Sequence, residues 1–228
     1  MNYNVICRGY IMLSIFVFMS LISVSQQHPG LKAGVNFSSF KSDQFDFKNS
    51  IGFGGGFATV WVISNKLDFL IDFTYESFGL KIMGREYDFS SSTQKNAEEY
   101  SASSNGAYGS ILPNYSIIPE RLSVNAGFIY GVTWVNDKNM NTIYVNNENL
   151  DEDVSLSELS STLSGGDFYV AIGASGGTEA LKVNVRYNLG LKNYGKSDES
   201  LYSDLKIKRN FLQVSLSYFL LNSKIIRR

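Results

Sequence analysis

The chain has 228 residues and a net charge of −1, with 44% hydrophobic, 14% aromatic and only 18% charged residues. The length suits one ordinary domain or one long all-β domain. A near-neutral chain offers no electrostatic basis for nucleic-acid binding, and its scarcity of charge argues against disorder. Because charged residues usually make up about a quarter of a soluble domain, the composition excludes an ordinary cytosolic protein.

The N-terminus has the features of a cleavable signal peptide. Arg8 supplies a positive charge, residues 11–24 form a mostly apolar core, and Ser23-Val24-Ser25 places small residues at a cleavage position. The core is short for a transmembrane helix, although an uncleaved anchor is an alternative. The sequence therefore predicts that residues 1–25 are removed on export and that the mature chain starts near Gln26.

The mature chain has no cysteine, because Cys7 precedes the apolar core of the signal peptide. For the same reason Cys7 is not placed as the lipidated cysteine of a lipoprotein. An exported protein without disulfides must be held together by its core, by closure of a sheet or by lipid. No second long apolar run follows the signal peptide, which excludes a helical membrane bundle.

Apolar and polar residues alternate with a period of two along the mature chain, which is the pattern of β-strands. In residues 66–80 one face holds Leu67, Phe69, Ile71, Phe73 and Tyr75. The opposite face holds Asp68, Asp72, Thr74 and Glu76. The same reasoning predicts eight strands, at 30–39, 51–63, 66–80, 107–117, 121–135, 167–176, 180–193 and 211–218.

The connections between these strands alternate in length. Three are tight turns, at 64–65, 118–120 and 177–179. Four are long and rich in Ser, Asn, Asp and Gly, at about 40–50, 81–106, 136–166 and 193–207. Outer-membrane β-barrels have short periplasmic turns and long external loops, and strands of about 9–11 residues cross the bilayer. The sequence thus predicts an all-β fold, an eight-stranded antiparallel up-and-down transmembrane β-barrel over residues 26–219, followed by a basic tail at 220–228.

The polar face of these strands predicts a charge network inside the barrel, because the interior of an eight-stranded barrel is filled by side chains. Inward glycines at 52, 54 and 56 would make room for long side chains. The alternative is the solvated face of a soluble sheet. The candidate lumenal residues are Lys32, Asp68, Asp72, Glu76, Arg121, Lys182 and Arg186.

Aromatic residues near the strand ends predict girdles at two membrane interfaces. They are Trp61, Tyr75, Tyr130, Trp134, Tyr187 and Tyr218.

Four segments resemble the PorT-like outer-membrane β-barrel family. They are the opening GLKAGVN at 30–36, the strand from KLDF at 66–69 to Tyr75, RYNLGLKN at 186–193, and FLQVSLSYF at 211–219. The resemblance covers nearly all of the mature chain and implies an eight-stranded outer-membrane barrel with no assigned activity. The chain departs from this pattern in its basic tail after Phe219.

No residue pattern points to an enzyme or to a cofactor. The one histidine, His28, follows the predicted cleavage site, and the mature chain lacks a thiol, so a His-dependent triad or a cysteine nucleophile is not expected. Ion pairing is the interpretation of the inward carboxylates, with a general acid–base pair as the alternative. Residues 136–166 are acidic, but an EF-hand register from Asp151 fails at Leu156 and Thr162. This loop is expected to be solvated, with weak divalent-cation binding as the alternative.

The sequence therefore predicts a non-enzymatic protein of the cell outer membrane that is surrounded by lipid. Its role would be structural, or recognition of a protein partner through the long external loops. Two alternatives stay open. The first is a narrow pore or a transport component. The second is a soluble exported β-barrel that binds a small apolar ligand, in which the apolar faces would point inward and the charges outward.

Overall fold

The structure is a computed structural model that describes residues 27–42, 47–88, 93–94, 98–119, 121–136, 143–145, 154–155, 163–194 and 207–220. The predicted signal peptide (1–25) lies outside these residues, as does the basic tail beyond Leu220. In the ranges given, no helix is long and apolar enough to cross a membrane.

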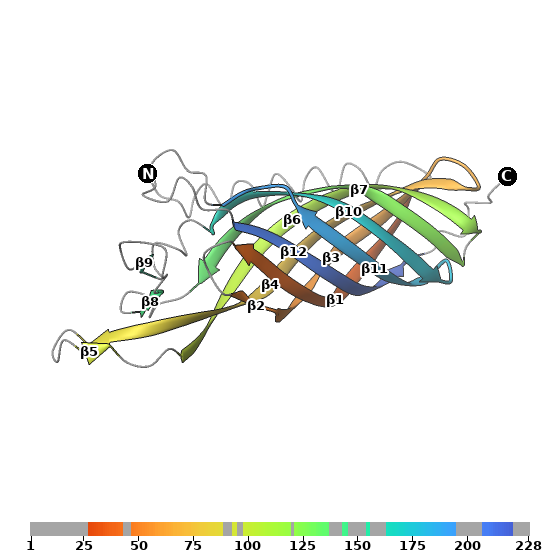
Figure 1. Cartoon of the computed structure of the whole chain (residues 1–228). Helices are drawn as coiled ribbons and strands as arrows, with labels where there is room; N and C mark the ends of the chain where they lie inside the picture. Colours follow the sequence, from red (N-terminus) through yellow and green to blue (C-terminus); the bar gives the residue numbers. More distant parts are fainter. Residues whose placement is uncertain are drawn as a thin grey trace, which may run out of the picture.

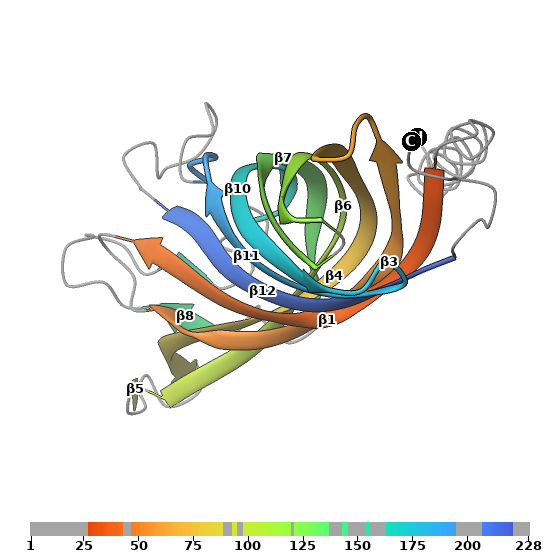
Figure 2. The same ribbon diagram turned by 90° about the vertical axis from the view of Figure 1, so that its right-hand side faces the viewer.

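Eight long antiparallel strands form one closed ring (Figures 1 and 2). Each strand pairs with its neighbours in chain order, and β1 pairs with β12 from Gly30↔Phe219 to Ser42↔Ile207. This confirms the predicted eight-stranded antiparallel up-and-down barrel. The long strands are β1 (Gln27–Ser42), β3 (Ser50–Val62), β4 (Leu67–Asp88), β6 (Glu98–Ile118), β7 (Leu122–Asn136), β10 (Gly165–Gly177), β11 (Leu181–Gly190) and β12 (Ile207–Phe219). Short strands are β2 (Phe47–Lys48), β5 (Thr93–Gln94), β8 (Ile143–Val145) and β9 (Val154–Ser155).

The short turns all lie at one end of the barrel, which we call the turn end. They span 63–66, 119–121 and 178–180. Hydroxyl groups close two of them: Leu67 N–H donates to Ser64 Oγ (3.1 Å) and Leu181 N–H donates to Thr178 Oγ1 (3.1 Å). The strand ends that the long connections join lie at the opposite end of the barrel, which we call the loop end (Figure 1).

Strands β4 and β6 continue as a hairpin well beyond the barrel wall (Figure 1). Their pairing runs through Lys81↔Ser101 to Gly84↔Glu98, and β2 and β8 add to the other edge of β4. The expectation of a loop over 81–106 was therefore wrong for most of that range. Backbone hydrogen bonds sustain the hairpin there without apolar alternation, so the pattern that revealed the other strands was absent.

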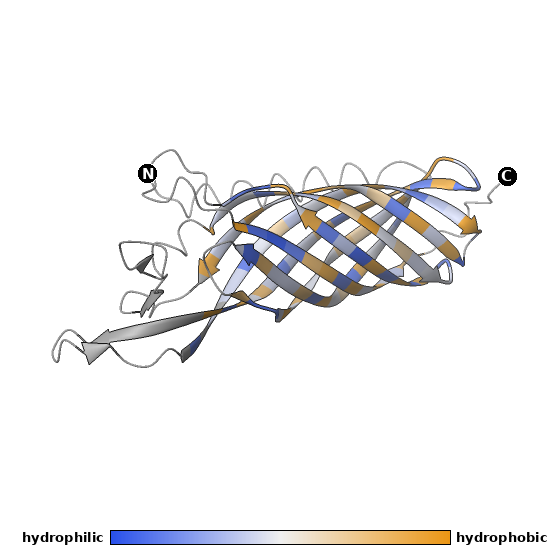
Figure 3. Cartoon of the chain, viewed as in Figure 1, coloured by the Kyte–Doolittle hydropathy of each residue, from blue (hydrophilic) through white to orange (hydrophobic). Residues whose placement is uncertain are grey.

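The apolar face of the sheet points outward on all eight long strands. Figure 3 shows hydrophobic and hydrophilic residues alternating along the strands. Side chains such as Phe57, Ile111 and Ile172 are at least half exposed, whereas the alternating polar side chains are buried inside. We define the apolar belt as the outward-facing positions of residues 31–37, 51–61, 67–75, 107–117, 122–134, 168–176, 181–189 and 212–218. None of these positions is Asp, Glu, Lys or Arg. The soluble ligand-binding alternative requires the reverse arrangement.

The glycines of β3 let β4 approach closely. A Cβ on Gly54 would collide with the Glu76 carboxylate, and one on Gly56 would collide with the backbone at Phe73 and Thr74. Gly55 faces the other way, and its nearest neighbour would be the Lys32 carbonyl oxygen at 3.4 Å.

These contacts predict different outcomes for two adjacent alanine substitutions. Gly56→Ala should lower the free energy of unfolding by about 1–3 kcal/mol, because the methyl group overpacks a rigid backbone contact. Gly55→Ala should change it by no more than about 0.5 kcal/mol. Urea denaturation of the refolded barrel measures both, and equal losses would contradict this account of the glycines.

Candidate functional site: the polar interior of the barrel

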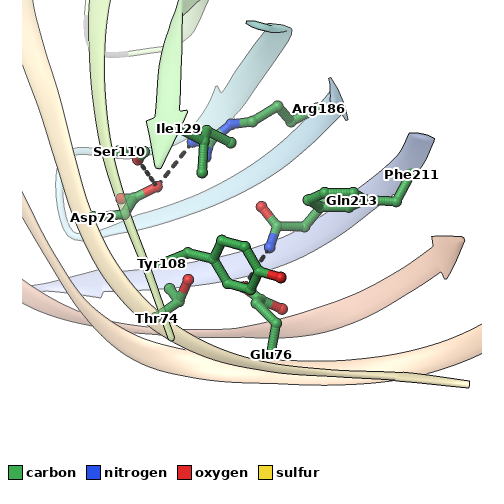
Figure 4. Close-up of a pocket in the computed structure, with 9 residues that line it drawn as sticks. All are labelled: Asp72, Thr74, Glu76, Tyr108, Ser110, Ile129, Arg186, Phe211 and Gln213. Carbon is green, nitrogen blue, oxygen red and sulfur yellow. Dashed lines mark hydrogen bonds and ion pairs between the residues drawn. The ribbon is translucent and has the colours of Figure 1, made fainter. Parts of the chain in front are cut away.

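Three charged side chains from distant parts of the chain meet in the middle of the barrel. Figure 4 shows two of them, Asp72 and Arg186. Lys32 Nζ lies 2.8 Å from Asp72 Oδ2, and Arg186 Nη2 lies 3.0 Å from the same oxygen. Ser110 Oγ also donates to it, at 3.2 Å. The side chains of the three charged residues are at most 3% exposed. We call Lys32, Asp72 and Arg186 the mid-barrel charge cluster.

Glu76 joins this cluster through amide side chains. Its Oε1 accepts a hydrogen bond from Gln213 Nε2 (2.8 Å), and Gln213 Oε1 in turn accepts one from Lys32 Nζ (3.2 Å). Asn36 Nδ2 donates to the other carboxylate oxygen of Glu76. Two cations therefore face two carboxylates, which is the condition under which buried charges are tolerated.

The other three candidate residues lie apart from this cluster. Asp68 is buried nearer the turn end, where it accepts a hydrogen bond from Asn114 Nδ2 (2.8 Å). Arg121 is exposed on the turn before β7, where it lines a small cavity at the turn end together with Ser123 and Lys182. Lys182 is half-buried at the start of β11, with its Nζ 6.0 Å from the centre of the Phe219 ring. Alternation assigned both cations to the inward face, but each lies at the turn end, where the barrel wall stops.

A second buried ion pair lies closer to the loop end and was missed from the sequence. Arg209 is 1% exposed and its guanidinium donates to the Asp167 carboxylate and to Tyr169 Oη (2.8 Å). The ring of Phe78 lies under it, 4.3 Å from Cζ. The hydroxyl groups around the pair are those of Tyr108, Thr133, Tyr169 and Tyr194. We call Arg209, Asp167 and these side chains the loop-end charge cluster.

The signal for this pair was present in the residue numbering. Residues an even number of positions apart on a strand face the same side of the sheet. Arg209 is four positions from the inward Gln213, and Asp167 is two positions from the inward Tyr169. The predicted last strand began at residue 211, however, so Arg209 fell outside it.

Little space remains between the two clusters. The cavity there has a volume of about 10 Å³, which is room for about one water molecule. Its lining residues are Asp72, Thr74, Glu76, Tyr108, Ser110, Ile129, Arg186, Phe211 and Gln213 (Figure 4). Edge-on contacts among Phe78, Tyr108, Tyr169 and Phe211 close the interior beside it.

Of the residues considered for catalysis, the inward carboxylates are those described above, whereas the histidine lies elsewhere. His28 pairs with Val60 near the turn end, away from the long connections. Within the described part of the chain, no group of His, Cys, Asp or Glu side chains is arranged to hold a metal ion. Most of the acidic loop at 136–166 lies outside that part.

On the exterior at the loop end, Glu99 bridges two lysines. It lies 3.0 Å from Lys48 Nζ and 2.6 Å from Lys81 Nζ, and all three side chains are substantially exposed. Hydrogen bonds from Lys81 and then Lys48 lower the pKa of the Glu99 carboxyl below its usual value.

No family model matches the chain, and no curated protein matches it. Solved structures resemble it. Neisserial surface protein A has 12% sequence identity and a TM-score of 0.45, over 84% of this chain and 97% of that one. Ail, the attachment invasion locus protein of Yersinia pestis, has 13% identity and a TM-score of 0.41, over 86% and 99%. The outer membrane protein OprG from Pseudomonas aeruginosa has 10% identity and a TM-score of 0.40, over 86% and 95%. These sequence identities and TM-scores are too low to decide what the chain does. The function must therefore be argued from the residues of the chain itself.

The mid-barrel charge cluster predicts a large effect for a substitution that barely changes shape. Asp72→Asn leaves Lys32 and Arg186 without their shared anion, and breaking a buried pair costs about 3–5 kcal/mol of stability. Glu99→Gln removes a carboxylate that also bridges two cations, but in an exposed position, so its effect should be much smaller. Urea denaturation of both variants checks this, and comparable losses would contradict the assigned role of Asp72.

Proposed function

We propose that the chain is a non-enzymatic β-barrel protein of the outer membrane whose apolar belt lies in the hydrocarbon of the bilayer. The observation that carries the proposal is the belt itself. Soluble monomers rarely expose a contiguous apolar patch of more than a few hundred Å². Here uncharged, mostly apolar positions continue around all eight long strands of the closed barrel.

The height of the belt fits a bilayer. On β4 it runs from Leu67 to Tyr75, which is nine residues. With a rise of about 3.4 Å per residue and a tilt of about 40°, these span about 23 Å, close to the apolar band of about 25 Å in outer-membrane barrels. Above the belt the outward positions become polar, with Ser39 and Lys41 on β1 and Asn210 and Lys208 on β12.

Aromatic side chains mark both edges of the belt. Trp61 and Tyr218 are exposed one residue from the turn end of their strands, and Tyr75 packs against Trp134 toward the loop end, with ring centroids 6.0 Å apart. Trp and Tyr are enriched at membrane interfaces, where their amphipathic rings suit the headgroup level. Both edges of the belt therefore match the positions of interfacial girdles.

The role that fits this molecule best is recognition at the cell surface through the loop end. Outer-membrane barrels keep short turns in the periplasm and long loops outside, which would direct the β4–β6 hairpin outward. The narrow-pore alternative has less support, since the cavity between the two charge clusters has a volume of only about 10 Å³. Removal of residues 1–25 and membership of the PorT-like family complete the proposal, supported by the N-terminal pattern and by the four matching segments.

Arginine substitutions at two equally exposed positions, one isoleucine and one leucine, test the membrane location. Ile172 is 60% exposed in the middle of the belt, and Leu220 is 61% exposed just beyond β12 at the turn end. In vesicles, Ile172→Arg should lower the free energy of unfolding by about 2–4 kcal/mol, whereas Leu220→Arg should lower it by about 0–1 kcal/mol. On a water-exposed surface both substitutions would be nearly neutral, and that result would refute the proposal.

A further inference from the structure

Two lysines lie directly opposite each other above the apolar belt. Lys41 on β1 pairs with Lys208 on β12 in the antiparallel register, and both are exposed. Their neighbours Phe40 and Arg209 are buried inside, so the lysines point outward. Opposite residues have Cβ atoms about 4.5–5.5 Å apart, and like charges in such a pair are destabilising. Among the ion pairs of the described residues, none includes either lysine.

In a second pair of opposed lysines, the repulsion between the two charges is relieved by a carboxylate. Lys48 on β2 is opposite Lys81 on β4, and Glu99 from β6 bridges both, at 3.0 and 2.6 Å. One opposed pair is thus neutralised by a carboxylate of the protein, whereas the Lys41–Lys208 pair has no such carboxylate within the described ranges. The Lys41–Lys208 pair therefore presents two adjacent ammonium groups that one bridging anion can neutralise, as Glu99 does for Lys48 and Lys81.

The height of the Lys41–Lys208 pair indicates which anion is close by. The last apolar pair below it is Phe37↔Leu212, and the polar pair Ser39↔Asn210 lies between. Four residues along tilted strands raise the lysines about 10 Å above that apolar pair. The headgroup layer extends about 5–7 Å beyond the hydrocarbon on each side, and lysine stems are long enough to bring the ammonium groups back to it. Figure 3 shows the strongly hydrophilic loop-end tips of β1 and β12 next to the apolar wall.

We propose that Lys41 and Lys208 form a binding site for the phosphate group of an anionic membrane lipid in the leaflet at the loop end. The site rests on the proposed membrane location, since only a barrel in a bilayer holds a lipid headgroup at this height. A phosphate carries negative charge and several acceptor oxygens, so one group can accept hydrogen bonds from both ammonium groups and remove their mutual repulsion.

The test compares the full-length mature barrel in vesicles of phosphatidylcholine with the same barrel in vesicles that also contain phosphatidic acid. The double variant Lys41→Gln/Lys208→Gln should be more stable than the parent in phosphatidylcholine, because the repulsion is gone. With phosphatidic acid the order should reverse, because only the parent gains from the phosphate. The affinity for phosphatidic acid should fall about fivefold for one lysine and about thirtyfold for both.

Lys66→Gln is the matched control, because Lys66 is an exposed lysine on the β3–β4 turn at the other end of the barrel. It should show no reversal between the two lipids. A similar response of Lys66→Gln and the double variant would overturn the proposal, since it would reflect general attraction of a basic side chain to an anionic surface.

Two further outcomes would also overturn the proposed lipid site, one by showing a different ligand and the other by refuting the membrane location. If inorganic phosphate in the buffer stabilises the parent in phosphatidylcholine as much as phosphatidic acid does, the site takes free phosphate rather than a lipid. If the parent fails to insert even into phosphatidylcholine, the membrane location itself is refuted, because insertion into that lipid does not depend on the lysines.

Discussion

Closure of the sheet between β1 and β12 is the constraint on which the rest of the molecule depends. An open edge would leave a row of backbone N–H and C=O groups without partners, and in hydrocarbon each unpaired group costs several kcal/mol. The β1–β12 ladder runs without a break from Gly30↔Phe219 to Ser42↔Ile207. Once the ring is closed, each long strand has one face outside and one inside, and the alternating sequence assigns apolar side chains to the first and polar side chains to the second.

The narrow interior then decides which polar side chains can be buried. Charges cannot stay unpaired in so dry a space, and the two clusters meet this requirement differently. In the mid-barrel charge cluster the carboxylate of Asp72 is shared by two cations, Lys32 from β1 and Arg186 from β11. In the loop-end charge cluster Arg209 and Asp167 form a pair surrounded by tyrosine hydroxyls and aromatic rings. Together they occupy much of the interior between the middle of the barrel and the loop end, and the cavity between them has a volume of about 10 Å³.

The fold was predictable from the sequence wherever the outward positions of a strand are apolar and its inward positions are polar. The alternation of Leu67 to Tyr75 against Asp68 to Glu76 fixed both the strand and its inward residues. Beyond the belt the outward positions are polar, as at Lys208 and Asn210. The first residues of β12 and the β4–β6 hairpin therefore lack the alternation of apolar and polar residues. Which lumenal charges meet also lay beyond the sequence. Asp72 and Arg186 are 114 positions apart, and their contact depends on strand register and tilt across the ring.

The most direct test of the central claim, that the apolar belt is in contact with lipid, uses the chain's two tryptophans. Trp61 and Trp134 lie near opposite edges of the belt. In vesicles of phosphatidylcholine brominated on its acyl chains, the fluorescence of both should be strongly quenched, and Trp61→Phe and Trp134→Phe variants assign the signal to each edge. Emission that is unaffected by the brominated lipid and is instead quenched by iodide in the buffer would show that the belt faces water, which contradicts the account.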